Sequence, residues 1–291
     1  MTLTLVDIYL GLGGSQLPPN PGTVSIDDFV IDSRQAAQGS CFIALAGEHT
    51  DGHLYIDAAI EQGAYAIIAQ QIPSGLQSNI VHPTSDPFPT GDSNVPVIFI
   101  VDDSLTALQQ LAANWRSHHN PIVIGITGSV GKTSSKELIA AVLRQQYATL
   151  WNVGNLNNEI GLPLTLLRIE AQHEYAVLEM GFYVEGEITH LCNLAPPKMG
   201  IITNLGPIHL ERAGSMEAIY RGKSELVQAL PPDGHAVLNW DDKWVRRMAD
   251  LSPAPVFRYG LSAECDLWAD EISSEGLEGI RFRFNHRTDS G

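Results

Sequence analysis

A glycine-rich segment with a single lysine, residues 127–133 (Thr-Gly-Ser-Val-Gly-Lys-Thr), follows an apolar run and precedes a run with helical spacing. Between a buried strand and a helix, such a loop can wrap phosphate groups with its backbone N–H groups. Lys132 would place a cation on the β and γ phosphates, and the hydroxyl of Thr133 would ligate Mg²⁺. The candidate nucleotide-binding residues of the loop itself are Gly128, Ser129, Val130 and Gly131.

The loop fits a short form of the phosphate-binding pattern. Position 126 is isoleucine and Gly125 comes one residue too early for G-x-x-x-x-G-K-[ST], so the match is to T-G-x-x-G-K-T. A Gly-Lys-Thr turn before a helix can also arise by chance. The predicted strand at 122–126 and the predicted helix at 134–147 favour phosphate binding over chance.

Two further segments place polar residues at the ends of apolar runs. Glu179 lies near the end of the predicted strand at 175–180, where a sheet presents a carboxylate that could ligate Mg²⁺, although solvated glutamates are common there. Residues 200–204 repeat the arrangement, and His209 follows. A lone histidine is more often structural or solvated than a metal ligand.

Two other features are ambiguous when they are taken alone. Lys223 lies in a predicted helix at 216–230, where a solvated surface lysine is normally the better interpretation. Asn155, Asn157 and Asn158 form an amide-rich loop that could read polar ligand edges or could be ordinary turn chemistry.

The elements that must hold these residues alternate between strand and helix. After residue 121 we predict strands at 122–126, 175–180, 200–203 and 235–238, separated by helices. This alternation indicates an α/β fold with a mostly parallel sheet covered by helices on both faces. Nucleotides bind such sheets at the carboxyl ends of the strands. Asp103 is expected to cap a helix that joins this part to a first domain, and residues 81–96 are expected to form a loop.

Composition narrows the class of protein. The chain has 291 residues, 44% hydrophobic content and a formal net charge of -16, which predicts two soluble domains that repel nucleic acid. Three widely spaced cysteines indicate reduced, buried thiols in a cytosolic protein. The absence of a long apolar run predicts no membrane insertion, so we expect a cytoplasmic location.

Several segments together resemble the Mur ligase family in identity, order and spacing. They are residues 127–133, residues 155–161 (Asn-Leu-Asn-Asn-Glu-Ile-Gly), residues 178–181 (Leu-Glu-Met-Gly), residues 202–204 with 209–211, Lys223, and residues 238–242 (Leu-Asn-Trp-Asp-Asp). Within the family, the Glu-Met-Gly and Asn-Asn-Glu-Ile-Gly-Leu-Pro-Leu runs look like the member that joins D-alanyl-D-alanine to UDP-N-acetylmuramoyl-tripeptide. In the first part of the chain, residues 32–34 (Asp-Ser-Arg) and 51–53 (Asp-Gly-His) are similar to the domain that binds the UDP-linked substrate.

The resemblance implies a role for each matching residue. Ser33 and Arg34 would lie near the nucleotide sugar, although Arg34 could also form a surface salt bridge. Thr133, Glu179 and His209 would bind the metal, and Lys132 would serve the ATP phosphates. Lys223 matches a lysine that relatives carbamylate. The candidates for the adenosine end are Asn155, Asn158, Asn239 and Asp242.

The resemblance also implies the organisation and the reaction. Residues 1–102 would bind the UDP-muramyl peptide, residues 103–120 would form a connecting helix, and residues 121–291 would form the central ATP-binding domain. With ATP and Mg²⁺, the reaction would be amide ligation through an acyl phosphate, as in peptidoglycan precursor synthesis. Family members continue into a third, carboxy-terminal domain. We therefore expect this chain alone to bind the UDP substrate weakly and to have little complete ligase activity.

Three alternatives remain open from the sequence. The chain could be another ligase of the family, which adds a diamino acid or adds glutamate to folate. It could be a non-catalytic module that keeps the UDP-sugar and ATP sites. It could also be a generic P-loop ATPase, which would explain Lys132 and leave Lys223 and the first domain unexplained.

Overall fold

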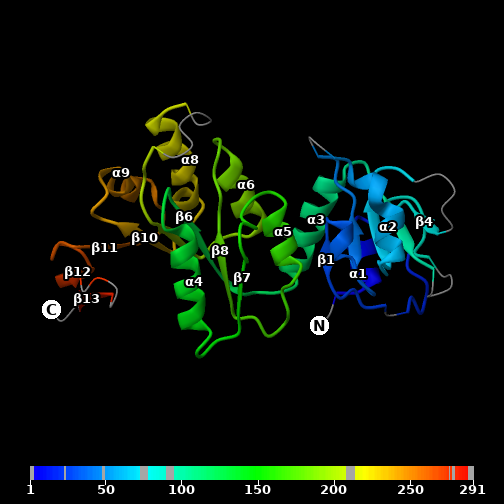
Figure 1. Cartoon of the computed structure of the whole chain (residues 1–291), viewed down its shortest axis with the longest axis horizontal. Helices are drawn as coiled ribbons and strands as arrows, with labels where there is room; N and C mark the ends of the chain where they lie inside the picture. Colours follow the sequence, from blue (N-terminus) through cyan, green and yellow to red (C-terminus); the bar gives the residue numbers. More distant parts are fainter. Residues whose placement is uncertain are drawn as a thin grey trace. The chain divides into compact units, whose positions relative to one another are not determined.

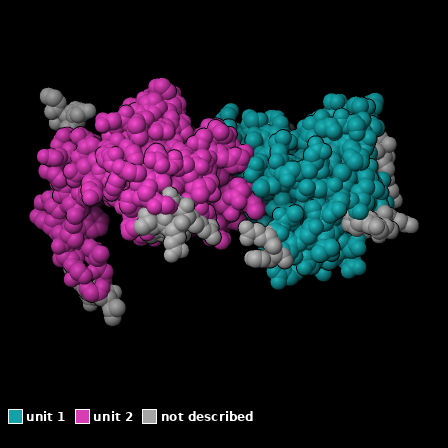
Figure 2. Space-filling view, turned by 90° about the horizontal axis from the view of Figure 1, so that it is seen from above, with its two compact units in different colours: residues 1–120, 163–172 teal, residues 121–162, 173–291 magenta. Residues whose placement is uncertain are grey.

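The computed structural model describes residues 3–22, 24–47, 50–72, 78–89, 95–207, 214–274, 276 and 279–287. The chain forms two compact units, which are coloured separately in Figure 2. Unit 1 contains residues 1–120 and 163–172, and unit 2 contains residues 121–162 and 173–291.

Unit 1 is built on a parallel sheet whose strand order, within the described residues, is β1-β2-β3-β5-β4. The strands are β1 (Phe29–Val30), β2 (Cys41–Ile43), β3 (Ala66–Ala69), β4 (Asn79–Val81) and β5 (Val97–Ile100). The helices are α1 (Leu5–Gly11), α2 (Ile56–Glu61) and α3 (Ser104–Ser117), with short 3-10 helices at η1 (Ser33–Gln35) and η2 (Gly52–Tyr55). Phe42, Ile67 and Ile98 of adjacent strands are fully buried and pack with Ile56 of α2. Buried β-branched and aromatic residues explain why these short runs form central strands.

Helix α3 begins where the sequence predicted a cap. The side chain of Asp103 accepts a hydrogen bond from the backbone N–H of Thr106, and a buried stripe includes Leu108, Leu111 and Trp115. The Trp115 indole donates to the backbone oxygen of Ile169 at 2.9 Å, within the segment 163–172 that belongs to this unit. Helix α3 belongs to unit 1. The chain passes between the two units three times, because the segment 163–172 returns from unit 2 to unit 1.

Unit 2 contains the larger sheet, with the order β13-β12-β11-β10-β9-β6-β8-β7 among the described residues (Figure 1). All its pairs are parallel except β12 with β13. The strands are β6 (Ile122–Thr127), β7 (Thr149–Trp151), β8 (Tyr175–Glu179), β9 (Met199–Ile202), β10 (His235–Asn239), β11 (Val256–Gly260), β12 (Leu267–Ser274) and β13 (Ile280–His286). The helices are α4 (Lys132–Leu143), α6 (Glu187–Leu194), α8 (Met216–Gln228) and α9 (Lys243–Arg246), followed by η3 (Arg247–Leu251). Helix α5 (Gly161–Leu166) begins in unit 2 and ends in the segment 163–172 of unit 1.

Alternating residues of β6 show that helices cover both faces of this sheet. Ile124 and Ile126 pack in one cluster with Ala140 of α4. A Cβ built on Gly125 would point the other way and meet Leu226 of α8. Because successive side chains of a strand point to opposite faces, α4 and α8 lie on opposite sides. The predicted α/β fold with a mostly parallel sheet is confirmed.

Three predicted helix boundaries, in two helices, were wrong. Helix α4 begins at Lys132 and not at Ser134, because Gly131 in the left-handed conformation (φ 84°) ends the loop directly before it. The same helix ends at Leu143, and the N–H groups of Gln145 and Gln146 bind back in turns before β7 starts. Helix α8 ends at Gln228, just ahead of a Pro-Pro pair that cannot continue a helix.

The prediction for the cysteines is confirmed, because all three are buried and free. Within the described part of the chain, no helix has both the length and the apolar character needed to cross a membrane.

Candidate functional site

The glycine-rich loop leaves the carboxyl end of β6 and is held by the end of the neighbouring strand β9. Val130 donates its N–H to the side-chain oxygen of Asn204 at 2.9 Å, and its carbonyl accepts from Asn204 Nδ2 at 2.9 Å and Thr203 Oγ1 at 2.7 Å. Gly128 has φ 149°, and a Cβ there would lie 1.9 Å from the Thr203 hydroxyl. Only glycine fits this close approach.

Lys132 starts α4 and is partly buried under the loop. Its Nζ donates to the carbonyl oxygens of Gly128 at 2.9 Å and Ser129 at 3.3 Å. Burial lowers the pKa of Lys132, and the charge of Glu179 opposes this shift. The ammonium thus lies within the loop that would receive phosphate oxygens.

Glu179 is the last residue of β8 and is only 2% exposed. Its Oε2 accepts from the Thr133 hydroxyl at 2.8 Å, and its Oε1 accepts from Asn157 Nδ2 at 2.8 Å. The structure thus brings together the two described residues for which the sequence suggested metal binding. Both carboxylate oxygens are oriented by neighbouring polar groups, which keeps the carboxylate beside the first turn of α4.

Lys223 lies on α8 and is buried, with 4% exposure. Its Nζ sits 4.8 Å from the ring centroid of Phe182. Burial, followed by the nearby charge of Lys132, lowers the pKa of Lys223 to about 7. Lys223 is therefore no solvated surface lysine, and close to neutral pH a large fraction of its amine is uncharged.

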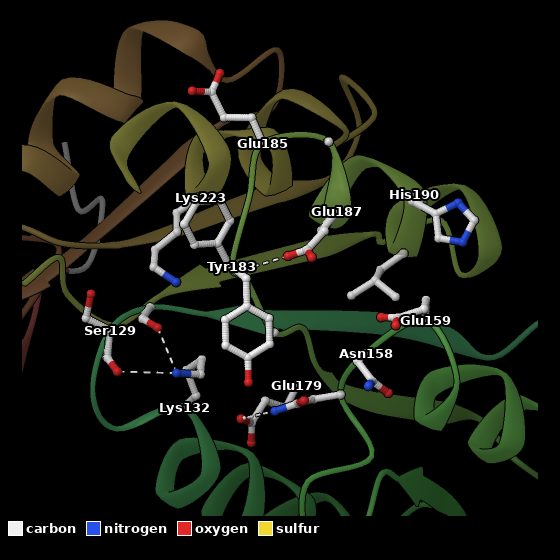
Figure 3. A pocket seen from close by; sticks show the side chains of 16 residues that line it. Ser129, Lys132, Asn158, Glu159, Glu179, Tyr183, Glu185, Glu187, His190 and Lys223 are labelled. Carbon is white, nitrogen blue, oxygen red and sulfur yellow. Dashed lines mark hydrogen bonds between the residues drawn. The ribbon is translucent and has the colours of Figure 1, made fainter. Parts of the chain in front are cut away.

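Lys132, Glu179 and Lys223 line one pocket with a volume of about 370 Å³. Figure 3 shows Lys132 and Lys223 on one side of it and Asn158, Glu159 and His190 on the other. Tyr183 projects between the two sides (Figure 3). The pocket is thus cationic at its phosphate-loop end and carries carboxylates elsewhere, an arrangement suited to a ligand with both phosphate and other polar groups.

Thr133 and Glu179 fit a divalent cation of the Mg²⁺ type. Among the described residues, no group of three or more histidine, cysteine or acidic side chains forms a cage for a metal. Mg²⁺ does not need such a cage, because it is usually held by one or two carboxylates together with phosphate oxygens and water. The third expected ligand, His209, lies outside the described residues.

The asparagines of the amide-rich loop have different surroundings, and the roles of Asn155 and Asn158 at a nucleotide stay predictions. Asn158 lines the pocket, but its side-chain oxygen accepts from the N–H groups of Ile160 and Gly161. Asn155 is exposed and does not line this pocket. Asn157, the third asparagine of the loop, is the residue that contacts Glu179.

Asn239 and Asp242 are not part of this pocket, and their roles at the adenosine end stay predictions. Asn239 Nδ2 donates to the carbonyl of Thr203 at 2.7 Å. Asp242 accepts from the N–H of Leu205 at 2.7 Å and caps α9. Both side chains hold the segment that follows β9, which in turn holds the glycine-rich loop.

In unit 1, Ser33 and Arg34 lie in η1, directly after the carboxyl end of β1. Ser33 is buried, whereas the Arg34 side chain is 87% exposed and pairs with Asp32 at 2.6 Å. Hydrogen bonds from Arg34 lower the pKa of Asp32 to about 2. Nearby, His53 Nδ1 contacts Asp51 at 2.6 Å and its Nε2 accepts from the N–H of Gln70 at 2.9 Å, so this histidine ties two loops together.

Asn157 was named only as part of the amide-rich loop, without a role at the carboxylate, and Thr203 and Asn204 had no predicted role. The only signal for them was their position, at the end of a strand or in a polar loop beside other candidates. Which amide in such a loop faces the carboxylate depends on the path of the backbone, and spacing does not determine that path.

The parallel sheet, the glycine-rich loop with its lysine and the strand-end carboxylate define a nucleotide-binding α/β protein of the P-loop class. The Mur ligase middle domain matches residues 126–289, which is more than half of the chain, and the Mur ligase family catalytic domain matches residues 26–116. The chain belongs to the Mur ligase family.

Several of its relatives within the family carry the same name. The chain is 39% identical over 256 residues to UDP-N-acetylmuramoyl-tripeptide--D-alanyl-D-alanine ligase of Synechocystis sp., covering 88% of this chain and 50% of that protein. Among solved structures, MurF from Acinetobacter baumannii is 27% identical with a TM-score of 0.78, over 97% of this chain and 60% of the other. MurF from Thermotoga maritima in complex with ADP is 30% identical with a TM-score of 0.70, over 88% of this chain and 57% of the other. The chain spans about half the length of such relatives.

Proposed function

We propose that this chain takes part in ATP-dependent ligation of D-alanyl-D-alanine to UDP-N-acetylmuramoyl-tripeptide, a step of peptidoglycan precursor synthesis. The substrates in this proposal are taken from the names of the relatives, and the chemistry is inferred from the residues of the site. The observation that carries the proposal is the hydrogen bond between Thr133 and Glu179 next to Lys132, in a pocket that also contains Lys223.

The proposed reaction has two steps. The free carboxylate of the UDP-muramyl peptide attacks the γ-phosphorus of ATP, so that a carboxyl C–O–P linkage forms and ADP leaves. The amine of D-alanyl-D-alanine then attacks the acyl carbon, the C–N bond forms, phosphate leaves and the amine gives up a proton. Phosphoryl transfer of this kind depends on positioning and on charge neutralisation.

The residues of this chain would serve the first step. The backbone N–H groups from Gly128 to Gly131 and the Lys132 ammonium would receive the phosphate oxygens of ATP. Thr133 and Glu179 would hold Mg²⁺. When bound, Mg²⁺ supplies positive charge that offsets the charge developing on the transferred phosphoryl group. Lys223 would face the same group, because it lies in the same pocket as Lys132.

Ser33 and Arg34 are our candidates for the contact with the UDP part of the substrate. Arg34 is exposed and keeps its guanidinium at the carboxyl edge of the unit 1 sheet, the edge where ligands of parallel sheets bind. Its pairing with Asp32 would have to loosen or to be shared when a diphosphate binds.

Binding and phosphate release together test the proposed function. We expect saturable binding of UDP-N-acetylmuramoyl-tripeptide in calorimetry, and we expect that any phosphate released from ATP requires this substrate. Lys132→Ala should abolish the release while leaving the binding of the UDP substrate intact. Phosphate release that ignores both the UDP substrate and D-alanyl-D-alanine would contradict the proposal and favour a generic ATPase.

A further inference from the structure

One fully buried asparagine completes the hydrogen bonding at the end of β8. The parallel pairing of β7 with β8 stops at Trp151 opposite Val177, two residues before Glu179. On the other side, β8 stays paired with β6, because Met180 donates its N–H to Ile126. The N–H and C=O of Glu179 therefore point toward the space that β7 has left. Buried backbone groups of this kind need partners.

The side chain of Asn152 supplies those partners. Its Oδ1 accepts from the N–H of Glu179 at 2.9 Å, and its Nδ2 donates to the Glu179 carbonyl at 3.0 Å. The second N–H of the same amide donates to the Leu156 carbonyl at 2.7 Å. Asn152 is fully buried, and both of its N–H groups and its oxygen are used. The Asn152 amide thus fixes the backbone of Glu179 and also the backbone carbonyl of Leu156, the residue before Asn157.

A buried lysine holds Asn152 from the opposite side. Lys136 on α4 is fully buried, although the same helix exposes Leu138 and Val142. Its Nζ donates to the backbone carbonyl of Asn152 at 2.5 Å and pairs with Glu137 at 3.1 Å. Burying an ammonium is costly unless its contacts compensate. The contact with the Asn152 carbonyl thus accounts for a lysine that faces the core at this position.

We propose that Asn152 is a positioning residue, which sets the Glu179 carboxylate and its partner Asn157 for the divalent cation of a bound nucleotide, and that Lys136 holds Asn152 in register. This inference rests on the proposed nucleotide site. Neither residue lines the pocket, so both act through Glu179. Residues behind a metal ligand typically change metal affinity roughly ten- to a hundredfold when they are removed.

The test measures Mn²⁺ binding to the chain with ADP, by the electron paramagnetic resonance signal of free Mn²⁺, and ADP binding without metal, by calorimetry. Asn152→Asp keeps the shape but loses both N–H donors, so we expect Mn²⁺ affinity to fall roughly ten- to a hundredfold. Metal-free ADP affinity should stay unchanged, because the loop and Lys132 are untouched. Asn193→Asp, on an exposed position of α6, is the matched control and should change neither value.

Lys136 variants keep the test decisive if Asn152→Asp does not fold. Lys136→Met removes the donor to Asn152 and should weaken Mn²⁺ binding in the same direction, whereas Lys136→Gln keeps an N–H donor and should restore part of it. Unchanged Mn²⁺ affinity in Asn152→Asp and Lys136→Met would overturn the inference. An equal loss of metal-free ADP binding would also overturn it, because that result indicates general damage.

Failure of the proposed function gives a different result. If the unaltered chain binds no ADP and no Mn²⁺, both the nucleotide site and the inference fail. If the unaltered chain binds both and Asn152→Asp binds them equally well, only the inference fails.

Discussion

At the scale of single residues, the site combines two lysines of different character, of which Lys132 is partly buried and Lys223 is buried. Lys132 donates to the carbonyls of its own loop, whereas Lys223 sits against the Phe182 ring. A buried amine that keeps its charge costs stability, and this cost has a pH dependence that can be measured. Burial of Lys223 thus lowers the stability of the fold while it makes an uncharged, reactive amine available near neutral pH.

Lys223→Met should stabilise the chain, most strongly at low pH. The pKa of Lys223 is lowered from 10.5 to about 7 in the folded state, so the unfolded chain binds more protons between these values. The destabilising effect is therefore complete below about pH 7 and shrinks as pH rises toward 10.5. Thermal unfolding at pH 6 and pH 9 measures the change. The gain should be larger at pH 6, and the exposed Lys243→Met should show no such difference. A gain that is independent of pH would contradict this account.

Lys223 should also take up carbon dioxide, as the family resemblance suggested. The uncharged amine attacks the carbon of CO₂, a C–N bond forms, and one N–H proton passes to solvent. Because the pKa is lowered to about 7, the reactive form is already abundant near neutral pH. Native mass spectrometry in bicarbonate should show a mass gain of one CO₂ at pH 8 that is smaller at pH 6 and absent in Lys223→Arg. No gain at either pH would argue against the modification.

At the scale of elements, the site depends on how β9 holds the loop after β6. Thr203 and Asn204 fix both backbone groups of Val130, and the two glycines of the loop have different constraints. Gly128 is in close contact with Thr203, whereas a Cβ at Gly131 would meet nothing within 4 Å. A side chain at Gly128 is therefore excluded by contact with Thr203, whereas a side chain at Gly131 is disfavoured only by the positive φ of the backbone.

Alanine substitution should separate these two constraints. Gly131→Ala should cost roughly 1–2 kcal/mol through its positive φ and should leave a folded chain that still binds Mg–ADP. Gly128→Ala should cost more and should abolish binding, because the new Cβ would lie 1.9 Å from the Thr203 hydroxyl. Urea unfolding and ADP titration check both variants. Equal losses in the two variants would show that the contact with Thr203 does not matter.

Much of this element-level arrangement could be predicted from the sequence. Alternating apolar runs and helical spacings predicted β6, β8, β9 and β10 of the larger sheet but not β7, and the Asp103 cap predicted α3. Glu179 was predicted to be near the loop because strand ends of a parallel sheet meet at one edge. These predictions depend on local pattern and on general sheet topology, and both can be read along the chain.

Asn152 and Lys136 could not be predicted in this way. A lysine between Ser135 and Glu137 on a helix has the pattern of an exposed residue, and the exposed Leu138 has the pattern of a buried one. On α4 it is Lys136 that is buried, with its Nζ on the Asn152 carbonyl, and Leu138 that is exposed. The backbone of Glu179 lacks a strand partner on one side because the pairing of β7 with β8 ends at Val177. This feature depends on how the two strands pair in the fold, and residue spacing does not reveal it.

At the scale of the whole molecule, an acidic chain gathers two of its few cations in one pocket of unit 2. The formal net charge is -16, so attraction for an anionic nucleotide must come from this local group and not from the overall field. Unit 1 has its own core and its own sheet edge, which is where we place the UDP-linked substrate.

Binding of Mg–ADP should therefore stabilise the two units unequally. A ligand stabilises the folded form of the part that binds it, so amide exchange should slow most around residues 128–133 and 203–205. Exchange in β2 and β3 of unit 1 should change little. Hydrogen–deuterium exchange with mass spectrometry measures this difference. Protection confined to unit 1 would contradict the placement of the nucleotide.

The central claim is that the loop ending in Lys132 binds a nucleoside triphosphate whose metal is shared with Glu179. The most direct measurement is calorimetric titration of a non-hydrolysable ATP analogue, with and without Mg²⁺, into the chain and its Lys132→Ala and Glu179→Gln variants. We expect Lys132→Ala to weaken binding roughly ten- to a hundredfold in both conditions, because a charge-assisted contact is lost. Glu179→Gln should lose only the part of the affinity that depends on Mg²⁺. Identical affinities for all three proteins would contradict the claim.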